Sequence, residues 1–309
     1  MISEQDRLQL AQKSLLGLSI GDAFGQQFFV STDDLTRYLQ NQIAPPTPWY
    51  FTDDTIMAMG IYDCLQDFGY IHQDSLAKVF AKNYMKDNSR GYGGTAHAIL
   101  RNIYQGKPWK QASSEAFDGM GSMGNGGAMR SALIGAYFYD DLEKVIGQAR
   151  LSAEVTHAHQ EAQIGTIAVA LAAAIAFQNT LKGNQISSKE FLSTIIELLP
   201  QSETKSYIKR GLNISIDTNI QSVISILGDS SDMTAQHTVP FCLWVVSHHL
   251  SHFENAIWQT VNGLGDRDTT CAIVGSIVAL SASEETIPTS WIQATESIYN
   301  SDFLIIREE

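Results

Sequence analysis

The sequence predicts an all-α protein, and three observations support that prediction. Apolar residues recur at the spacing of an α-helix along most of the 309-residue chain. Stretches in which apolar and polar residues alternate, as they do in half-buried strands, are scarce. No repeat of solenoid length and no low-complexity linker interrupts the pattern, so we expect residues 1–309 to form one compact domain.

The helical spacing is clearest in three segments. Residues 76–87 read LAKVFAKNYMKD, residues 166–181 read TIAVALAAAIAFQNTL, and residues 271–282 read CAIVGSIVALSA. The longest apolar run, residues 164–177, is shorter than the roughly 18 residues that suggest a membrane span. We therefore expect it to be a buried helix.

Prolines and glycines mark the breaks between helices. Three of the 7 prolines fall in APPTPWYF, residues 44–51, which predicts an extended approach to a helix that begins near Thr52. Glycines concentrate in RGYGG, residues 90–94, and in GMGSMGNGG, residues 119–127. Such concentrations indicate loops in which a Cβ would obstruct the backbone or a close neighbour.

The composition disfavours several kinds of partner. Hydrophobic residues make up 44% and charged residues 17%, as in an ordinary globular protein, and the formal net charge is −13. That charge disfavours long nucleic acid, which clustered Lys and Arg would bind. Three widely separated cysteines, Cys64, Cys242 and Cys271, predict neither a disulfide framework nor a zinc knuckle. The N-terminus lacks the basic region of a secretory signal, so we expect a cytoplasmic protein. We also expect a monomer with no membrane partner.

Two stretches place paired carboxylates at the start of an apolar helix. Residues 52–55 read TDDT, and residues 266–269 read DRDT. Helix capping explains either stretch alone, because Asp and Thr are favoured N-caps and acidic first turns complement the helix dipole. Together, however, the stretches supply more oxygen atoms than two caps need, and such hard ligands suit Mg²⁺ or Mn²⁺. If the helix starts meet, four carboxylates share a small volume and need cations to offset their repulsion.

The glycine-rich segment of residues 119–130, GMGSMGNGGAMR, has two interpretations. Its free backbone N–H groups suit phosphate oxygens at a helix start, or its glycines permit a tight helix crossing. Arg130 reaches a phosphate or serves as an internal salt-bridge partner. A triad of Ser122 with His157 is disfavoured, because the segment lacks G-x-S-x-G spacing. His157 and His159 do not share a helical face, which disfavours a zinc pair and leaves His157 as a structural or ligand-facing histidine.

Six motifs carry a resemblance to a known family. They are GLSIGDAFG, FTDDTIMA, RGYGG, FDGMGSMGNGGAMR, SAEVTHAH and GLGDRDTTCAIVGSI, in this order between residues 17 and 280. In order and spacing they resemble the motifs of the ADP-ribosylglycohydrolases, which include the dinitrogenase reductase-activating glycohydrolase and the ADP-ribosylserine hydrolases. The resemblance implies a compact all-α orthogonal helical bundle with two Mg²⁺ or Mn²⁺ ions that removes ADP-ribose from an ADP-ribosylated protein.

The resemblance also implies roles for individual residues. The implied metal ligands are Thr52, Asp53, Asp54, Asp266, Asp268 and Thr269, and Asp54 or Asp266 would orient the attacking water. The glycine turn is most similar to that of the ADP-ribosylserine hydrolases, in which it surrounds the diphosphate and ribose of ADP-ribose. The residues implied to contact ADP-ribose are Arg90, Gly91, Tyr92, Gly93, Phe117, Gly121, Ser122, Met123, Gly124, Asn125 and His157.

Two positions depart from the family pattern. Many relatives carry a glutamate on a mobile flap, four residues after the GDAxG motif, where this chain has Phe29. The family's GGDTDT is LGDRDT here, which retains both aspartates and the threonine. Metal binding is therefore expected to survive.

The missing glutamate affects the expected linkage. A general acid–base group typically contributes ~10² to 10⁴ in rate, so its loss favours a good leaving group. We expect ADP-ribosylarginine rather than ADP-ribosylserine as substrate, unless Asp33 or Asp34 takes the role of the glutamate. The alternative function is a catalytically weak module that binds ADP-ribose.

Overall fold

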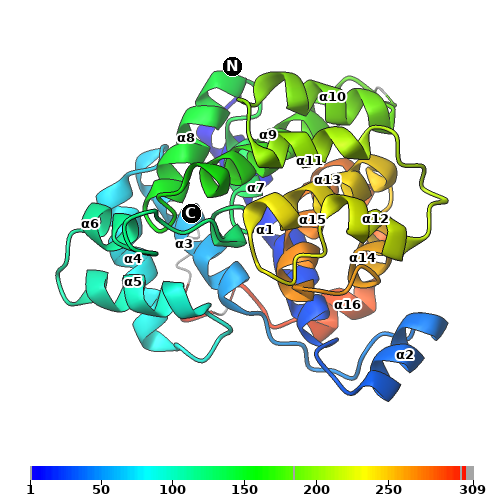
Figure 1. The fold of residues 1–309 in the computed structure, drawn as a ribbon, viewed down its shortest axis with the longest axis horizontal. Helices are drawn as coiled ribbons and strands as arrows, with labels where there is room; N and C mark the ends of the chain where they lie inside the picture. Colours follow the sequence, from blue (N-terminus) through cyan, green and yellow to red (C-terminus); the bar gives the residue numbers. More distant parts are fainter. Residues whose placement is uncertain (1, 184, 300, 304–309) are drawn as a thin grey trace.

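The computed structural model describes residues 2–183, 185–299 and 301–303, and these residues form a bundle of helices (Figure 1). The described residues contain two isolated β-bridges but no regular strand, which confirms the all-α prediction. The α-helices are α1 (Glu4–Gln26), α2 (Thr32–Asn41), α3 (Asp53–Phe68), α4 (Gln73–Lys86), α5 (Gly94–Tyr104), α6 (Trp109–Ser114), α7 (Ala132–Tyr137), α8 (Leu142–Glu154), α9 (Gln160–Leu181), α10 (Ser188–Leu198), α11 (Glu203–Gly211), α12 (Ile220–Leu227), α13 (Ala235–His249), α14 (Phe253–Val261), α15 (Arg267–Ser281) and α16 (Thr289–Ala294). Two short 3₁₀ helices are η1 (Asn125–Gly127) and η2 (Glu284–Thr286).

Helices α1 and α15 lie side by side in the interior, although they come from opposite ends of the sequence (Figure 1). Glycines at four-residue intervals on α1 permit this approach. A Cβ on Gly21 would lie 2.1 Å from the backbone oxygen of Cys271, and one on Gly25 would lie 2.2 Å from that of Arg267. Because no real Cβ approaches a backbone atom so closely, the distance between these two helices depends on the glycines.

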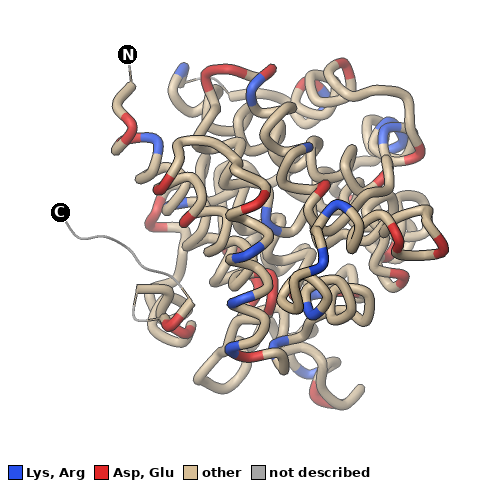
Figure 2. The backbone as a smooth tube through the Cα atoms, turned by 90° about the vertical axis from the view of Figure 1, so that its left-hand side faces the viewer, with Lys and Arg blue, Asp and Glu red and all other residues tan. Residues whose placement is uncertain are grey.

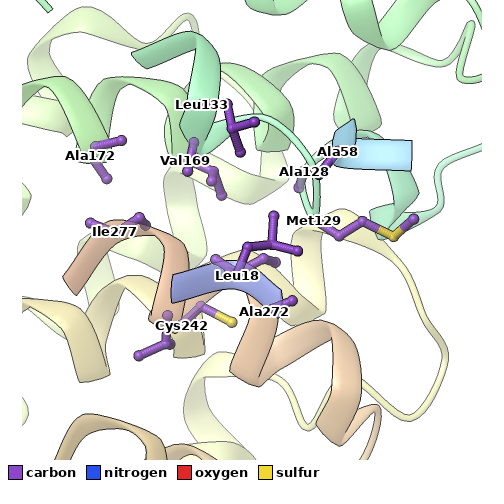
Figure 3. Close-up of a cluster of buried hydrophobic side chains, with 14 of the residues drawn as sticks. Leu18, Ala58, Ala128, Met129, Leu133, Val169, Ala172, Cys242, Ala272 and Ile277 are labelled. Carbon is purple, nitrogen blue, oxygen red and sulfur yellow. The ribbon is translucent and has the colours of Figure 1, made fainter. Parts of the chain in front are cut away.

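The core around this pair is built of small and branched aliphatic side chains. Figure 3 shows Leu18 of α1 facing Ala272 of α15, with Val169 of α9 and Leu133 of α7 nearby. Buried apolar residues form one continuous cluster from Ala11 to Phe303. Close packing of this kind contributes about 25 cal/mol for each Å² of apolar surface removed from water.

Helix α9 contains the long apolar run that the sequence analysis assigned to a buried helix. By length and composition α9 is able to cross a membrane, but 72% of its most apolar window is buried inside the protein. Its small residues, such as Ala170 and Ala173, lie against Gly135 of α7. The prediction of a buried helix at residues 164–177 is therefore confirmed.

The chain leading to α3 has the extended form that its prolines predict. Residues 43–52 contain no helix, and α3 begins at Asp53 with Thr52 as its N-cap. Trp49 pairs with the C-terminal segment, because its backbone N–H donates to Ala294 and its carbonyl accepts from Glu296. This pairing fixes the approach to α3 against the far end of the chain.

Charged residues are distributed over many helices. In the view of Figure 2, Lys and Arg occur as scattered short segments and acidic positions surround them. The three cysteines are buried and free, as predicted.

Candidate active site

The start of α3 presents two buried aspartates. Thr52 caps the helix by accepting a hydrogen bond from the backbone N–H of Asp54 at 3.4 Å, so the capping interpretation is correct for this threonine. Asp53 and Asp54 are only 7% and 1% exposed. The backbone N–H of Asp53 donates to the carbonyl of Arg90 at 2.7 Å, which attaches the loop of residues 87–93 to this helix start.

A third aspartate, Asp22 of α1, holds the start of α3 in place. Its carboxylate accepts hydrogen bonds from the backbone N–H groups of Thr52 and Thr55 at 2.9 and 3.1 Å. It also accepts from the hydroxyl groups of the same two threonines at 2.8 and 2.5 Å. No role was predicted for Asp22, which lies in the GLSIGDAFG motif, although a lone carboxylate within an apolar helix is a usable signal. Asp22 therefore accepts most of the hydrogen bonds at this helix start, although the Thr52 hydroxyl also lies 3.1 Å from Oδ2 of Asp54.

The start of α15 meets the start of α3. Asp266 is the N-cap residue of α15, and Asp268 and Thr269 lie in its first turn. The hydroxyl of Thr269 donates to Oδ2 of Asp54 at 3.4 Å, a long hydrogen bond between residues far apart in the sequence. The structure thus brings together the two carboxylate stretches that the sequence analysis paired.

The clustered carboxylates repel one another, and burial deprives them of water. Burial raises the pKa of Asp53 to about 8, and the charges of Asp22 and Asp266 add to the rise. Burial, followed by the charge of Asp22, raises the pKa of Asp54 well above its usual range. Burial and the charge of Asp266 do the same for Asp268. In Asp22 burial raises the pKa to about 6 against the hydrogen bonds that favour its charged form.

Two atoms of the cluster have unsatisfied hydrogen-bonding capacity. Oδ1 of Asp54 and Oδ1 of Asp268 are buried and accept no hydrogen bond within the described residues. Over the same residues, no group of three or more His, Cys, Asp or Glu side chains forms a ready metal cage. A cation here would therefore need threonine hydroxyls as well as carboxylates, a donor set of hard oxygen atoms that suits Mg²⁺ or Mn²⁺.

The carboxylates form one end of a cavity of about 400 Å³. Its other walls come from the glycine turn, the loop before α5, and the segment before α13, and the large side chains at its rim include Phe117, Met120 and Met233. The residues implied by the resemblance that line this cavity are Asp53, Asp54, Gly91, Gly93, Phe117, Ser122, Met123, Gly124, Asn125, His157, Asp266, Asp268 and Thr269.

Four residues expected at the site lie outside the lining. The guanidinium of Arg90 binds both carboxylate oxygens of Glu296, at 2.6 and 3.0 Å, and also Asp87. Tyr92 is buried beneath the same loop, and Thr52 faces Asp22. Gly121 packs closely against the backbone of His159, since a Cβ there would lie 2.7 Å from the backbone nitrogen of His159. Their predicted contacts with a ligand or a cation stay predictions.

The glycine turn offers fewer free N–H groups than its sequence suggests. The backbone N–H of Gly124 donates to the hydroxyl of Ser122 at 3.1 Å, and that of Asn125 donates to the carbonyl of Met233 at 2.9 Å. The interpretation that this turn presents consecutive free backbone N–H groups is therefore wrong for residues 124 and 125. Gly124 and Thr234 also form an isolated bridge.

The segment of residues 229–234 connects the glycine turn with the start of α15. Its Met233 carbonyl holds Asn125, as described, while its Ser230 hydroxyl accepts from the backbone N–H of Asp266 at 2.9 Å. The side-chain amide of Asn125 completes the connection by donating to Oδ2 of Asp266 at 2.7 Å. Asn125 thus orients a carboxylate of the cluster, a contact that sequence spacing did not predict.

Arg130 and His159 also differ in their roles. Arg130 is fully buried in the cavity wall and takes part in none of the ion pairs of the described residues, so the expected salt bridge is wrong. Burial lowers the pKa of its guanidinium to about 9. His159 caps α9 by accepting from the N–H of Glu161 at 3.1 Å, which is a structural role.

Phe29 lies beyond the end of α1 and outside the cavity lining. The guanidinium of Arg267 is 5.0 Å from the centre of the Phe29 ring and donates to the carbonyl of Phe28 at 2.6 Å. The two departures from the family pattern therefore contact each other. Asp34 caps α2 with Ser31 and pairs with Arg37 at 2.9 Å, and it too lies outside the lining.

Comparison with known proteins agrees with this geometry. A sequence model of the ADP-ribosylglycohydrolase family matches residues 3–306. The chain is 28% identical to the ADP-ribosylhydrolase ARH3 of Gallus gallus, covering 92% of this chain and 87% of that protein. It is 27% identical to the human ADP-ribosylhydrolase ARH3, covering 94% and 89%.

A solved structure, described as an ADP-ribosylglycohydrolase-related protein complex, has the same fold. Its TM-score is 0.65 at 22% identity, and the match covers 94% of both chains. Because the family model matches nearly the whole chain, the fold, the paired aspartates and the glycine turn all lie within the matched region. The chain belongs to the ADP-ribosylglycohydrolase family.

Proposed function

We propose that this protein hydrolyses the bond between C1″ of ADP-ribose and a modified protein side chain. One observation carries the proposal: the starts of α3 and α15 meet, with Thr269 hydrogen-bonded to Asp54, in a cavity that the adjoining glycine turn also lines. A ligand with a ribose at one end and a diphosphate beyond it fits this order of groups. The name of the ARH3 relatives, which are ADP-ribosylhydrolases, supports the same reaction.

We further propose that the carboxylate cluster holds two divalent cations, Mg²⁺ or Mn²⁺. The donors would be Thr52, Asp53, Asp54, Asp266, Asp268 and Thr269. The Thr52 hydroxyl donates its proton to Asp22 and so retains oxygen lone pairs for a cation. The unpartnered oxygens of Asp54 and Asp268 support this assignment, as does the mutual repulsion that raises their pKa values. Bound there, such cations supply Lewis acidity that polarises water and ribose hydroxyls.

The residues of the chain have distinct tasks in this reaction. Asp54 or Asp266 orients the water whose oxygen forms the new bond to C1″ while the bond from C1″ to the side chain breaks. The proton that the water gives up ends on the departing group. Positive charge develops on the ribose, and the neighbouring carboxylates stabilise it electrostatically. Asn125 keeps the Asp266 carboxylate in one orientation, since its amide donates to Oδ2. The glycine turn and Phe117 hold the remote half of the ligand, which positions the reacting bond.

For the linkage, we propose that arginine is preferred over serine. Besides the cluster, Asp232 is the one carboxylate among the described lining residues, and His237 and Thr234 already occupy its oxygens. With cations bound, the carboxylates of the cluster are ionised ligands rather than acids, so a proton donor for a serine oxygen is scarce, whereas a guanidinium is a better leaving group. Since Phe29 lies outside the lining, this preference rests on the scarcity of acids rather than on the phenylalanine ring.

Two variants test the site. Asp268→Asn is expected to lose at least ~10²-fold in turnover with little change in ADP-ribose affinity, because the diphosphate binds elsewhere. Ser122→Trp is expected to block ADP-ribose while retaining cations, because the indole fills the cavity beside the turn. Calorimetric titration with ADP-ribose and metal analysis, with an expected content near two ions per chain, separate these effects. Normal turnover by Asp268→Asn would show that the site lies elsewhere.

The linkage is tested with arginine- and serine-linked substrates assayed in parallel. Wild type is compared with Phe29→Glu and with an Asp33/Asp34 double alanine variant. Faster release from arginine in wild type supports the proposal. Efficient release from serine that survives loss of both aspartates contradicts it, and ADP-ribose binding without release from any substrate identifies a binding module instead.

A further inference from the structure

A chain of hydrogen bonds runs from the buried Arg130 to the cavity-lining His157. Nη2 of Arg130 donates to the hydroxyl of Thr156 at 2.7 Å and to the carbonyl of Ser152 at 3.1 Å. The Thr156 hydroxyl lies 2.7 Å from Nδ1 of His157. Arg130 and Thr156 are 0% and 2% exposed, so water does not compete for these contacts.

The protons in this chain can be assigned from elementary chemistry. A guanidinium only donates, so the oxygen of Thr156 must accept from Arg130. The single hydroxyl proton of Thr156 then needs an acceptor, and within the described residues its other partner is Nδ1 of His157. An oxygen that accepted from both neighbours would leave the Thr156 proton without a partner among the described residues, so the arrangement that satisfies every group has Nδ1 as acceptor and, in a neutral imidazole, the proton on Nε2.

The surroundings of His157 keep the ring neutral. Burial, and then the positive charge of Arg130, lower the pKa of His157 to about 3. The same geometry directs Nε2 toward the glycine turn. A Cβ added at Gly124 or Gly126 would lie 3.3 or 3.2 Å from Nε2, so the two glycines leave room for the ring and for a group beside it.

We propose that Arg130 is a positioning residue that acts through Thr156 to hold His157 with its proton on Nε2, so that the ring offers a hydrogen-bond donor to an acceptor in the cavity. Arg130 lies in the cavity wall, and its two terminal nitrogens are already engaged with Met57, Ser152 and Thr156. The acceptor is an oxygen of ADP-ribose beside the glycine turn, and this part of the inference rests on the proposed function. The proton assignment does not depend on it, because it follows from the unliganded chain.

Nuclear magnetic resonance of protein with ¹⁵N-labelled histidine tests the assignment directly. A His157→Gln spectrum identifies the His157 signals, and couplings between ring nitrogens and ring protons show which nitrogen is protonated. The expected result for wild type near neutral pH is a protonated Nε2 and a bare Nδ1. A His157 ring that carries its proton on Nδ1, or on both nitrogens, overturns the proposal.

Substitutions of Thr156 test the role of the hydroxyl. Thr156→Val keeps the shape but removes the relay, so we expect a mixture of the two neutral forms and ADP-ribose affinity weaker by about 3- to 10-fold. Thr156→Ser retains the hydroxyl and should restore both the wild-type spectrum and the affinity. Thr194→Val, at a threonine of α10 that lies outside the cavity lining and whose hydroxyl donates to the carbonyl of Glu190, is the matched control and should change neither.

The outcomes separate the relay from the proposed function. A valine variant with the wild-type proton position and affinity overturns the role of Thr156. If the valine variant does not fold, the wild-type and serine spectra still decide, because a serine variant with an altered proton position contradicts the relay. A wild-type chain with the expected spectrum but no affinity for ADP-ribose supports the relay and overturns the choice of ligand.

Discussion

Asp22 is a buried carboxylate that organises a helix from outside it. It accepts from the backbone N–H groups of Thr52 and Thr55, and each buried donor left unpaired costs about 1–3 kcal/mol. Because removal also relieves repulsion within the cluster, we expect Asp22→Ala to lower the free energy of unfolding by about 2–4 kcal/mol. Urea denaturation measures the change.

The matched control for Asp22 is Asp6. Asp6 belongs to the exposed capping box with Ser3, where its carboxylate accepts from the backbone N–H and the hydroxyl of Ser3, so Asp6→Ala is expected to cost much less than Asp22→Ala. Equal losses in the two variants would contradict the special position of Asp22. Divalent-cation affinity provides a second measurement, since Asp22→Ala should weaken it and Asp6→Ala should not.

His157 makes stability depend on pH. Its pKa is about 3 in the folded protein, below the ordinary value of 6.5. The neutral ring therefore contributes stability that is present above pH 6.5 and is lost as the pH falls toward 3. We expect wild type to lose more stability than His157→Gln between about pH 7 and about pH 5. Urea midpoints at the two pH values measure the difference, and equal losses would count against the assigned pKa.

At the level of residues, the sequence shows which chemical groups are available for a site better than it shows where their side chains point. The aspartates and threonines of residues 52–55 and 266–269 were identifiable because hard oxygen donors recur at two helix starts. The ion pair of Arg90 with Glu296 was not predictable, because Glu296 lies 206 residues away in the sequence. Local spacing cannot show that such a partner turns the guanidinium away from the cavity.

At the level of elements, the packing of α1 on α15 determines whether the carboxylates meet. A Cβ at Gly21 would lie 2.1 Å from the oxygen of Cys271, so the helices must separate to accept it. We expect Gly21→Ala to lower the free energy of unfolding by about 3 kcal/mol or more and to weaken cation binding, because the start of α15 moves with the helix. Thermal unfolding and metal analysis measure the two effects.

Gly147 of α8 provides the control for this substitution. A Cβ added there meets no atom within 4 Å, and the position is exposed. Gly147→Ala should therefore stabilise the protein by up to about 1 kcal/mol through helix propensity. If Gly21→Ala behaved like Gly147→Ala, the close approach of α1 and α15 would not control the site.

Most helices were predictable, but their partners were not. Residues 76–87, 166–181 and 271–282 lie almost wholly in α4, α9 and α15, because apolar spacing of 3.6 residues specifies a helix with a buried face. The same spacing does not state which face meets which neighbour. The sequence alone therefore left open whether the two aspartate stretches meet. The family resemblance supplied the expectation that they meet, and the structure confirms it.

For the molecule as a whole, repulsion among the clustered carboxylates lowers the stability of the folded protein, and a bound cation should offset that repulsion. The chain already carries a net charge of −13, and several buried carboxylates share one end of the cavity. We expect Mg²⁺ or Mn²⁺ at 100 times its dissociation constant to stabilise the folded protein by ~2.7 kcal/mol relative to the chelated form. Thermal unfolding with and without a chelator measures the shift.

Two comparisons sharpen this prediction. Potassium at matched ionic strength should not reproduce the shift, and Asp268→Asn should reduce it. A wild-type melting temperature that does not respond to either divalent cation would contradict the proposed metal site.

The pairing of α1 with α15 also determines when the protein becomes functional during its synthesis. Gly21 leaves the ribosome long before Cys271, its neighbour in the folded core. At synthesis rates of roughly 5–20 residues per second, α1 waits roughly 10–50 seconds for the helix that covers its glycine face. Throughout that interval the nascent chain has the first aspartates but not the second, and an apolar helix surface without its partner. We therefore expect α1 to be a segment that chaperones protect during this interval. Ribosome-bound chains stalled before α15 should bind neither ADP-ribose nor divalent cations at this site.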